Sequence, residues 1–353
     1  LACWQHVDES CRLEGPRGVA EVLTQLAGFE APARAWEGQI LPRRVRDYRR
    51  EWLEEVTMSG EFAWGRLWGS GASAIRVTPI AIVPREQLDD WLALSSEPKT
   101  ERMSGPAADL LQALAAGGPM FPQSLPKAAN LVPAHVEMAL AELLARGFIT
   151  CDSFAAVRQM ITPPSRRRRA LAAVGRWCCF REGRGTRDEG RGAKLEFSLQ
   201  AAADRLKPDL QQGAGRGAMT EELTEMIARQ LLGRTGVVFR RVLDREKIPI
   251  TWAALRRVYR RLELRGEIRG GRFVAGFSGE QFALPEALSQ LRQIRRQGRR
   301  EPVSVTPADP LNFEGILTPL EMVASTVMNS ANGSGISNGA ADHINEERQR
   351  FVG

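Results

Sequence analysis

Residues 259–268 read YRRLELRGEI, and the pattern within them occurs three times along the chain. Each copy has two apolar residues three positions apart, a glycine four positions later, and then a short strand-like run. Apolar positions three apart lie on one helix face, and the glycine can adopt the left-handed conformation that ends a helix. Each copy is therefore expected to be a helix that runs into a strand. The copies are Leu53-x-x-Val56-x-x-x-Gly60-Glu61-Phe62, Leu140-x-x-Leu143-x-x-x-Gly147-Phe148-Ile149 and Tyr259-x-x-Leu262-x-x-x-Gly266-Glu267-Ile268.

The last two copies also share an upstream half. Gly118 precedes Gly147 by 29 residues, Gly236 precedes Gly266 by 30, and each upstream glycine is followed three residues later by phenylalanine. A repeat of this kind predicts the helix–turn–helix–strand order of a winged helix. We therefore expect an α+β fold of tandem winged-helix domains.

The predicted organisation follows from the repeat and from shifts in composition. In the first unit, Phe62–Trp64 and 75–77 are expected to form wing strands around a Gly69–Gly71 tip. The expected parts are a winged-helix-like unit at 16–92, a second winged helix at 104–162, a basic Gly- and Arg-rich linker with strand candidates at 163–218, a third winged helix at 219–277, a helix with strand candidates at 278–318, and a disordered tail at 319–353.

Local patterns predict the elements inside these units. The expected helices and strands are a helix over 19–26, helices over 110–114, 124–129 and 133–146 followed by strands at Ile149 and Phe154, a strand at 177–180, helices over 237–245 and 252–265, a turn at Gly270-Gly271, a helix over 285–296, and strands at 303–305 and 315–317. Thr220 and Thr251 are expected to cap the helices that follow them.

The positive charge is concentrated in the middle of the chain. The 353 residues carry 49 Lys and Arg against 42 Asp and Glu, but residues 166–300 hold 31 against 15. A basic segment on an acidic remainder indicates a polyanionic partner such as DNA. The alternative interpretation is a set of solvated arginine-rich helices.

Several classes of site are not indicated by the sequence. There is no GxxxxGK[ST] phosphate loop, so we expect no nucleotide cofactor in this chain and no RecA-like motor. The His and Cys spacings predict neither a metal site nor a disulfide. We expect no membrane span, no secretory signal and a cytoplasmic location. The chain begins at Leu1 and enters directly into folded-type sequence, so it is expected to be a fragment of a longer protein.

The third winged helix carries the predicted DNA contacts. Arginines one, three and four residues apart form a stripe along the helix that would enter or flank DNA, and two more flank the wing. These residues are Arg256, Arg257, Arg260, Arg261, Arg269 and Arg272. The alternative is a solvated face paired with Glu263 and Glu246. Trp64 and Arg66 combine an aromatic face with charge, as single-strand binding surfaces do.

The stretch GGRFVAGFSGEQFALPEA, residues 270–287, resembles the carboxy-terminal region of bacterial large helicase-related proteins (Lhr). Further similarities run from Gly28 to Leu317. They include Trp36-Glu37 with Leu41-Pro42 and Tyr48, Ser59-Gly60-Glu61 with Trp64, Arg146-Gly147 with Asp152 and Phe154, Gly175-Arg176-Trp177, Gly236 to Phe239, and Ala308-Asp309-Pro310-Leu311-Asn312.

The resemblance implies a parent that is an ATP-dependent superfamily 2 DNA helicase of the DEAD/DEAH-box type, moving 3′ to 5′ on single-stranded DNA. Its motor domains, which use ATP and magnesium, would precede Leu1. The resemblance also implies a small β-barrel, with strands at Trp177 and 303–317, and a similarity to bacterial DNA glycosylases. Some members are credited with uracil removal in this region and can form oligomers.

The chain departs from the family after Thr318-Pro319, where the family has a further strand with an acidic turn. Asp309 is then the one acidic residue left in a matched barrel motif and the candidate catalytic residue, although Asp before Pro also favours a turn. We expect a DNA-binding region of a helicase involved in DNA repair, with single-stranded or damaged DNA and the parent motor as partners. The alternatives are a uracil-type DNA glycosylase that acts by base flipping and a module that oligomerises the helicase.

Overall fold

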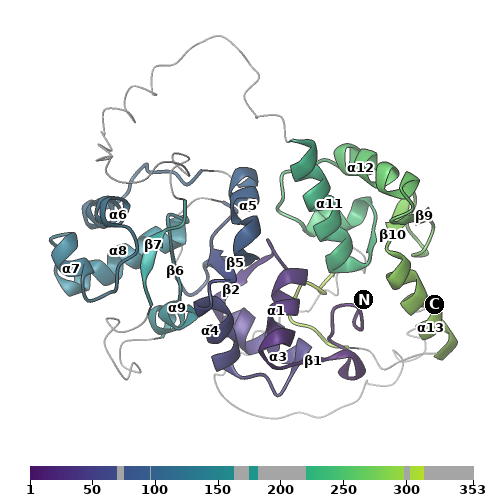
Figure 1. Cartoon of the computed structure of the whole chain (residues 1–353), viewed down its shortest axis with the longest axis horizontal. Coiled ribbons are helices and arrows are strands. Elements are labelled where there is room, and N and C mark those ends of the chain that lie inside the picture. Colours follow the sequence, from purple (N-terminus) through teal and green to yellow (C-terminus); the bar gives the residue numbers. More distant parts are fainter. Residues whose placement is uncertain (70–74, 96, 163–174, 182–219, 298–302, 314–353) are drawn as a thin grey trace, which may run out of the picture. The chain divides into compact units, whose positions relative to one another are not determined.

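The structure is a computed structural model that describes residues 1–69, 75–95, 97–162, 175–181, 220–297 and 303–313. The chain divides into residues 1–318 and 319–353, and the second part lies outside the described residues. So do the predicted tail, most of the predicted linker and the strand at 315–317. The described residues build three helix–sheet units, which we call the first, second and third units in chain order (Figure 1).

The first unit is a set of helices around the antiparallel sheet β2-β5-β4. The predicted helix end at Gly60 is confirmed, since this residue has φ +84° directly after α4. The strand predicted at 75–77 is wrong: these residues form a turn, and the buried run of β5 pairs with β4 instead. The elements are β1 Leu13–Glu14, α1 Gly15–Gln25, β2 Glu30–Pro32, α2 Ala33–Ala35, η2 Trp36–Ile40, α3 Leu41–Arg44, β3 Val45–Arg46, α4 Arg50–Met58, β4 Phe62–Gly65, β5 Pro79–Pro84, η3 Arg85–Gln87 and α5 Leu88–Leu94.

The second unit has the predicted order of three helices and a strand. Gly147, with φ +85°, ends its third helix as expected. Phe154 is not in a strand but begins a helix, whose first turn is capped by the Glu54 carboxylate of the first unit. The elements are α6 Gly105–Gly117, α7 Leu125–Ala128, α8 Pro133–Arg146, β6 Ile149–Cys151, α9 Phe154–Ile161 and β7 Trp177–Cys179.

The third unit contains two predicted helix caps that are confirmed. The Thr220 and Thr251 hydroxyls accept hydrogen bonds from the backbone N–H groups three residues later. Gly270-Gly271 belongs to strand β9 rather than a turn, in the sheet β8-β10-β9. The elements are α11 Glu221–Thr235, β8 Val237–Val238, η6 Arg240–Arg245, α12 Trp252–Leu264, β9 Arg269–Gly271, β10 Gln281–Ala283 and α13 Pro285–Gln297.

The described residues contain no closed barrel. Their sheets have two or three strands each, and β7, which holds Trp177, pairs with β6 inside the second unit. Residues 303–305 are extended but unpaired, because this segment is held by side chains: Arg43 donates to the carbonyl of Ser304, and Thr306 donates to Gln39 at 2.8 Å. The predicted barrel is thus not found among the described residues, and its expected strand at 315–317 lies outside them.

One apolar core spans the first and second units. Trp64 on β4 is fully buried and lies edge-on to Phe154 and Trp177, with ring centroids 5.5 and 6.4 Å away. The Thr150 hydroxyl donates to the Trp64 carbonyl at 2.5 Å. Large aromatic rings of both units lie in this core, so the first and second units pack together around a single hydrophobic core.

Polar side chains join the first and third units. Arg234 on α11 donates to the carbonyl of Ala27 at 2.6 Å and pairs with Glu246. Gln5 donates to the carbonyl of Arg234 at 2.7 Å, and Trp4 donates to the carbonyl of Gly233 at 2.9 Å. The amino-terminal residues therefore tie α11 to the first unit.

A buried ion pair lies between these two units. Arg44 donates from Nη1 to Asp309 Oδ2 at 2.9 Å and from Nη2 to Asp309 Oδ1 at 2.8 Å, and both side chains are fully buried. Arg44 also donates to Gln5 Oε1 at 3.0 Å. The backbone carbonyl of Asp309 accepts a hydrogen bond from Arg245 of the third unit at 2.5 Å.

The expectation of no disulfide is wrong, because Cys3 and Cys11 are bonded. The turn at His6, with φ +60°, and the short helix that ends at Cys11 bring the two residues together. Their separation of eight residues matches no short cysteine motif, so the pairing could not be predicted from local spacing. Cys151, Cys178 and Cys179 are not in a disulfide, and they lie in strands β6 and β7.

Replacing Asp309 with alanine should lower the free energy of unfolding by about 3–5 kcal/mol, because Arg44 would remain charged and buried without its partner. The double variant R44M/D309L should recover most of that loss, since no buried charge is left. Denaturant unfolding measures both. The control Asp109→Ala, on the exposed face of α6, should change stability by less than about 0.5 kcal/mol. An equal, small effect of D309A and D109A would contradict the buried pair.

The repeat glycines allow a matched test. Gly60, Gly147 and Gly266 all have positive φ, so alanine should cost about 1–2 kcal/mol at each. At Gly147 an added Cβ would also lie 2.8 Å from the backbone oxygen of Arg66, whereas nothing lies within 4 Å at the other two. G147A should therefore lose a further ~1–3 kcal/mol in the same unfolding assay. Equal losses at all three glycines would refute the close approach of the first and second units.

Candidate nucleic-acid interface

Helix α12 presents its arginines because its apolar residues are used in the core. Leu255, Val258, Tyr259 and Leu262 are buried. The Tyr259 hydroxyl donates to the carbonyl of Ala228 at 3.2 Å, and burial raises the pKa of this tyrosine well above its usual value. Arg256, Arg257 and Arg260 of the predicted stripe are exposed, whereas Arg261 is half-buried and Trp252 packs against Tyr259 and Phe282.

Two arginines of the stripe share one carboxylate at the wing. Arg260 Nη2 lies 2.5 Å from Glu280 Oε1, and Arg256 Nε lies 3.8 Å from Oε2 of the same side chain. All three side chains are exposed, between 41% and 59%. Because exposed ion pairs contribute only about 0–1 kcal/mol, a DNA phosphate can compete with Glu280 for these guanidinium groups.

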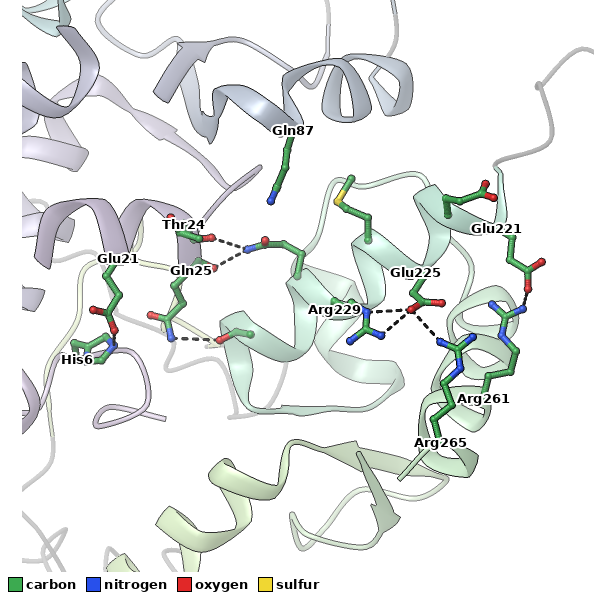
Figure 2. A pocket seen from close by; sticks show the side chains of 14 residues that line it. His6, Glu21, Thr24, Gln25, Gln87, Glu221, Glu225, Arg229, Arg261 and Arg265 are labelled. Atoms are coloured by element: carbon green, nitrogen blue, oxygen red, sulfur yellow. Dashed lines mark hydrogen bonds and ion pairs between the residues drawn. The ribbon is translucent and has the colours of Figure 1, made fainter. Parts of the chain in front are cut away.

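The other side of α12 is paired with α11. Figure 2 shows Arg261 against Glu221, and Arg265 and Arg229 both against Glu225. Glu225 accepts from Arg229 at 2.8 Å and from Arg265 at 3.3 Å, and these bonds hold its pKa below the usual value. Arg261 is therefore the member of the predicted stripe that is turned away from open surface.

These pairs line a cleft of about 1200 Å³ between α1 and the α11–α12 pair (Figure 2). Glu21 and Gln25 approach it from α1, and Gln87 approaches from η3. Since its arginines are already bonded to glutamates, the cleft offers little free positive charge for an anion. Among the described residues no group of three His, Cys, Asp or Glu side chains could hold a metal ion.

Three predicted arginines have no carboxylate partner among the described residues. Arg257 makes one hydrogen bond, from Nε to the carbonyl of Ala253 at 3.4 Å. Arg269 and Arg272 lie on and directly after the exposed strand β9, and all three arginines are exposed. They are the side chains of the predicted set that are most available to a phosphate.

The alternative interpretation was that the arginines of α12 pair with Glu263 and Glu246. Several of these arginines are indeed paired, but with other glutamates. Glu246 binds Arg234 in the interior, and Glu263 accepts the backbone N–H of Gly270 at 2.9 Å. The actual partners, Glu280 and Glu221, were missed. Glu280 lies 20 residues from Arg260 and comes near it only because β10 pairs with β9, a register that local spacing does not reveal.

The structure contradicts a DNA contact at Trp64, whose ring is fully buried and has no face open to a base. Arg66 is half-buried and donates to the carbonyl of Trp68 at 3.3 Å and to that of Ala145 in the second unit. Both residues hold the first and second units together. The prediction rested on the residue types alone, an aromatic ring beside a charge, whereas the neighbouring Ala63, Leu67 and Trp68 are also buried.

The structure also contradicts a catalytic role for Asp309. Its carboxylate is fully buried, and both oxygens bind Arg44. Oδ1 further accepts the backbone N–H of Leu311 at 2.8 Å, which is the turn that Asp before Pro favours. No substrate can reach this carboxylate in the folded chain.

No described helix has both the length and the apolar composition required to cross a membrane. Two family models with the description "Large helicase-related protein, winged-helix domain" match the chain. One, for the third such domain of the family, covers residues 1–85, and the other, for the fourth, covers residues 217–303. The second match contains the whole arginine stripe and the wing.

Curated relatives extend the similarity over most of the chain. The chain is 28% identical over 326 residues to "Lhr helicase/uracil glycosylase" of Escherichia coli, covering 87% of this chain and 20% of that protein. It is 30% identical over 311 residues to "Lhr helicase/ probable uracil glycosylase" of Mycolicibacterium smegmatis, covering 83% and 18%. The chain thus spans about a fifth of the length of these relatives.

Among solved structures, the "Streptomyces sahachiroi DNA glycosylase AlkZ" aligns with 82% of this chain and 70% of its own, at 12% identity and a TM-score of 0.41. That similarity is too low to carry an argument. The matches to two Lhr winged-helix domains and to Lhr helicases over most of the sequence are specific. The chain belongs to the large helicase-related family, as an Lhr-type carboxy-terminal region.

Proposed function

We propose that this chain is a DNA-binding region of an Lhr-type helicase that grips the phosphate backbone and is not catalytic alone. The observation that carries the proposal is the set of exposed arginines on α12 and beside β9, in a unit that matches an Lhr winged-helix domain. In winged helices these two elements are the ones that approach DNA.

The proposed contacts between arginines and DNA phosphates do not depend on the base sequence of the DNA. Guanidinium groups form paired hydrogen bonds with phosphate oxygens, and their binding releases condensed counterions. Arg257, Arg269 and Arg272 can do so directly, while Arg256 and Arg260 must first exchange Glu280 for a phosphate. The proposed partner is single-stranded or damaged DNA, held for the motor of the whole protein.

The role of the whole protein is part of the proposal. We place ATP and magnesium in DEAD/DEAH-box motor domains outside this chain, in a cytoplasmic enzyme of DNA repair that moves along DNA. The support is the name "helicase" that both curated relatives carry.

Two alternatives stay open. The relatives' names also include uracil glycosylase, and incubation of the purified chain with uracil-containing DNA would reveal abasic sites if the chain removes uracil. Against this alternative, Asp309, the catalytic candidate predicted from the sequence, is fully buried and paired with Arg44. For an oligomerisation module, sedimentation should show assembly that depends on concentration.

The variant R257Q/R269Q/R272Q should bind DNA with a log–log salt slope smaller in magnitude by about 2–3, because each lost phosphate contact removes ~0.7–0.9. Fluorescence anisotropy across salt concentrations measures the slope. The control R17Q/R34Q/R85Q removes the same charge from exposed positions of the first unit. If both triple variants shift the slope equally, the contacts are not at α12 and β9.

Glu280→Gln should raise the affinity for DNA about two- to five-fold at low salt, since the neutral amide no longer competes for Arg256 and Arg260; this matches the ~0.5–1 kcal/mol of an exposed pair. Glu86→Gln, an exposed carboxylate of the first unit, is the control for net charge. Weaker binding by E280Q than by E86Q would mean that the Glu280 pairs organise the interface rather than compete with DNA.

A further inference from the structure

Helix α13 has an arginine face that neither the sequence pattern nor the family match assigns. The helix starts two residues after β10, and its first half packs on the third unit through the buried Ala287 and Leu288. Its second half, from Leu291 to Gln297, is exposed apart from the half-buried Ile294. The arginines of this half are Arg292, Arg295 and Arg296.

The three arginines lie on one side of the helix. Residues three and four positions apart are neighbours on a helix surface, so Arg292 is adjacent to both Arg295 and Arg296. Ile294 points to the opposite side, toward a small cavity that it lines together with Cys3 and Leu311. Ala287, Leu288 and Ile294 are therefore used for packing, and the three arginines are left to solvent together with Leu291.

This face differs from α12 in its charge balance. Across the described residues, no carboxylate is recorded in an ion pair with Arg292, Arg295 or Arg296. On α12, by contrast, glutamates neutralise part of the stripe, as Glu280 and Glu221 do. No described carboxylate therefore offsets the positive charge on α13, which lies on the element that directly follows the wing.

We propose that the face formed by Arg292, Arg295 and Arg296 is a second phosphate-binding surface, which extends the DNA contact of α12 and the wing. The inference rests on the proposed function and names a site beyond it. The occupant is the sugar–phosphate backbone of DNA, because guanidinium groups on a helix that contains no aromatic residue fit phosphates and offer no ring on which a base could stack.

The length of α13 sets the reach of this contact. Arg296 lies 11 residues after the helix start, which is roughly 16 Å at ~1.5 Å per residue. A strand that passes the wing and reaches Arg296 must therefore extend about five further nucleotides, at ~3.4 Å each. Figure 1 shows α13 leading away from β9 and β10, as this path requires.

A role in stabilising the helix would account for only two of the three arginines. Arg295 and Arg296 lie in the last turn, where positive charge interacts favourably with the helix dipole. Arg292 lies one turn earlier and gains little from that effect, yet it completes the face. A purely structural role would change thermal unfolding and leave the salt dependence of DNA binding as it is.

The test is R292Q/R295Q/R296Q in the full chain, against R17Q/R34Q/R85Q as the charge-matched control. With a fluorescent 30-nucleotide DNA, the α13 variant should lose about 2–3 from the magnitude of the salt slope and bind about ten-fold more weakly or worse at low salt. The lysine variant R292K/R295K/R296K should keep most of the slope, because it retains the charge. The melting temperature of each variant is measured alongside.

The outcomes separate this inference from the proposed function. If wild type binds with a clear salt slope and the α13 glutamine variant matches the control, the second surface is overturned and the proposed function stands. If wild type shows no salt-dependent binding, both fail. Should the triple variant unfold, the single variant R292Q replaces it, with an expected slope change of about 0.7–0.9; no change there also overturns the inference.

Discussion

The arrangement of the described units depends on one buried ion pair, between Arg44 and Asp309. A buried pair gives back little more than the desolvation that it costs, but removing one partner leaves an uncompensated charge. The pair therefore favours one arrangement of the units over others, and it contributes little to the overall stability. Arg44 belongs to the first unit, the backbone of Asp309 binds Arg245 of the third unit, and Gln5 binds both Arg44 and the α11 backbone. If residues 303–313 moved away, Arg44 would lose its carboxylate partner and keep only its hydrogen bonds to Ile40 and Gln5.

Internal contacts use many of the arginines, so the net positive charge of the chain is larger than the positive surface that DNA can reach. Arg234 and Arg245 point inward and hold carbonyls and carboxylates between units. Arg261 pairs with α11, and Arg260 pairs with the wing. A short series of arginines on α12, on and after β9, and on α13 has no carboxylate partner in the part of the chain that the structure describes. The function proposed for the chain rests on this remainder and not on its net charge.

Features that depend on a few neighbouring residues were predicted from the sequence, whereas contacts between distant segments were not. Helix ends at Gly60, Gly147 and Gly266 and the caps at Thr220 and Thr251 were predicted because glycine conformation and capping act within a few residues. The Cys3–Cys11 bond, the Glu280 pairs and the burial of Trp64 were not, since each depends on how distant segments pack. Asp309 is another example: its motif suggested a candidate catalytic residue, and only the fold shows that its carboxylate is bonded to Arg44.

The central claim is that the chain holds DNA through phosphate contacts of its third unit. The most direct test is the salt dependence of DNA binding by the wild-type chain, measured by anisotropy between roughly 50 and 300 mM salt. Five phosphate contacts at α12 and the wing and three at α13 predict a log–log slope of about −6 to −7, with little difference between sequences of equal length. A slope close to zero, or no binding at low salt, would contradict the account.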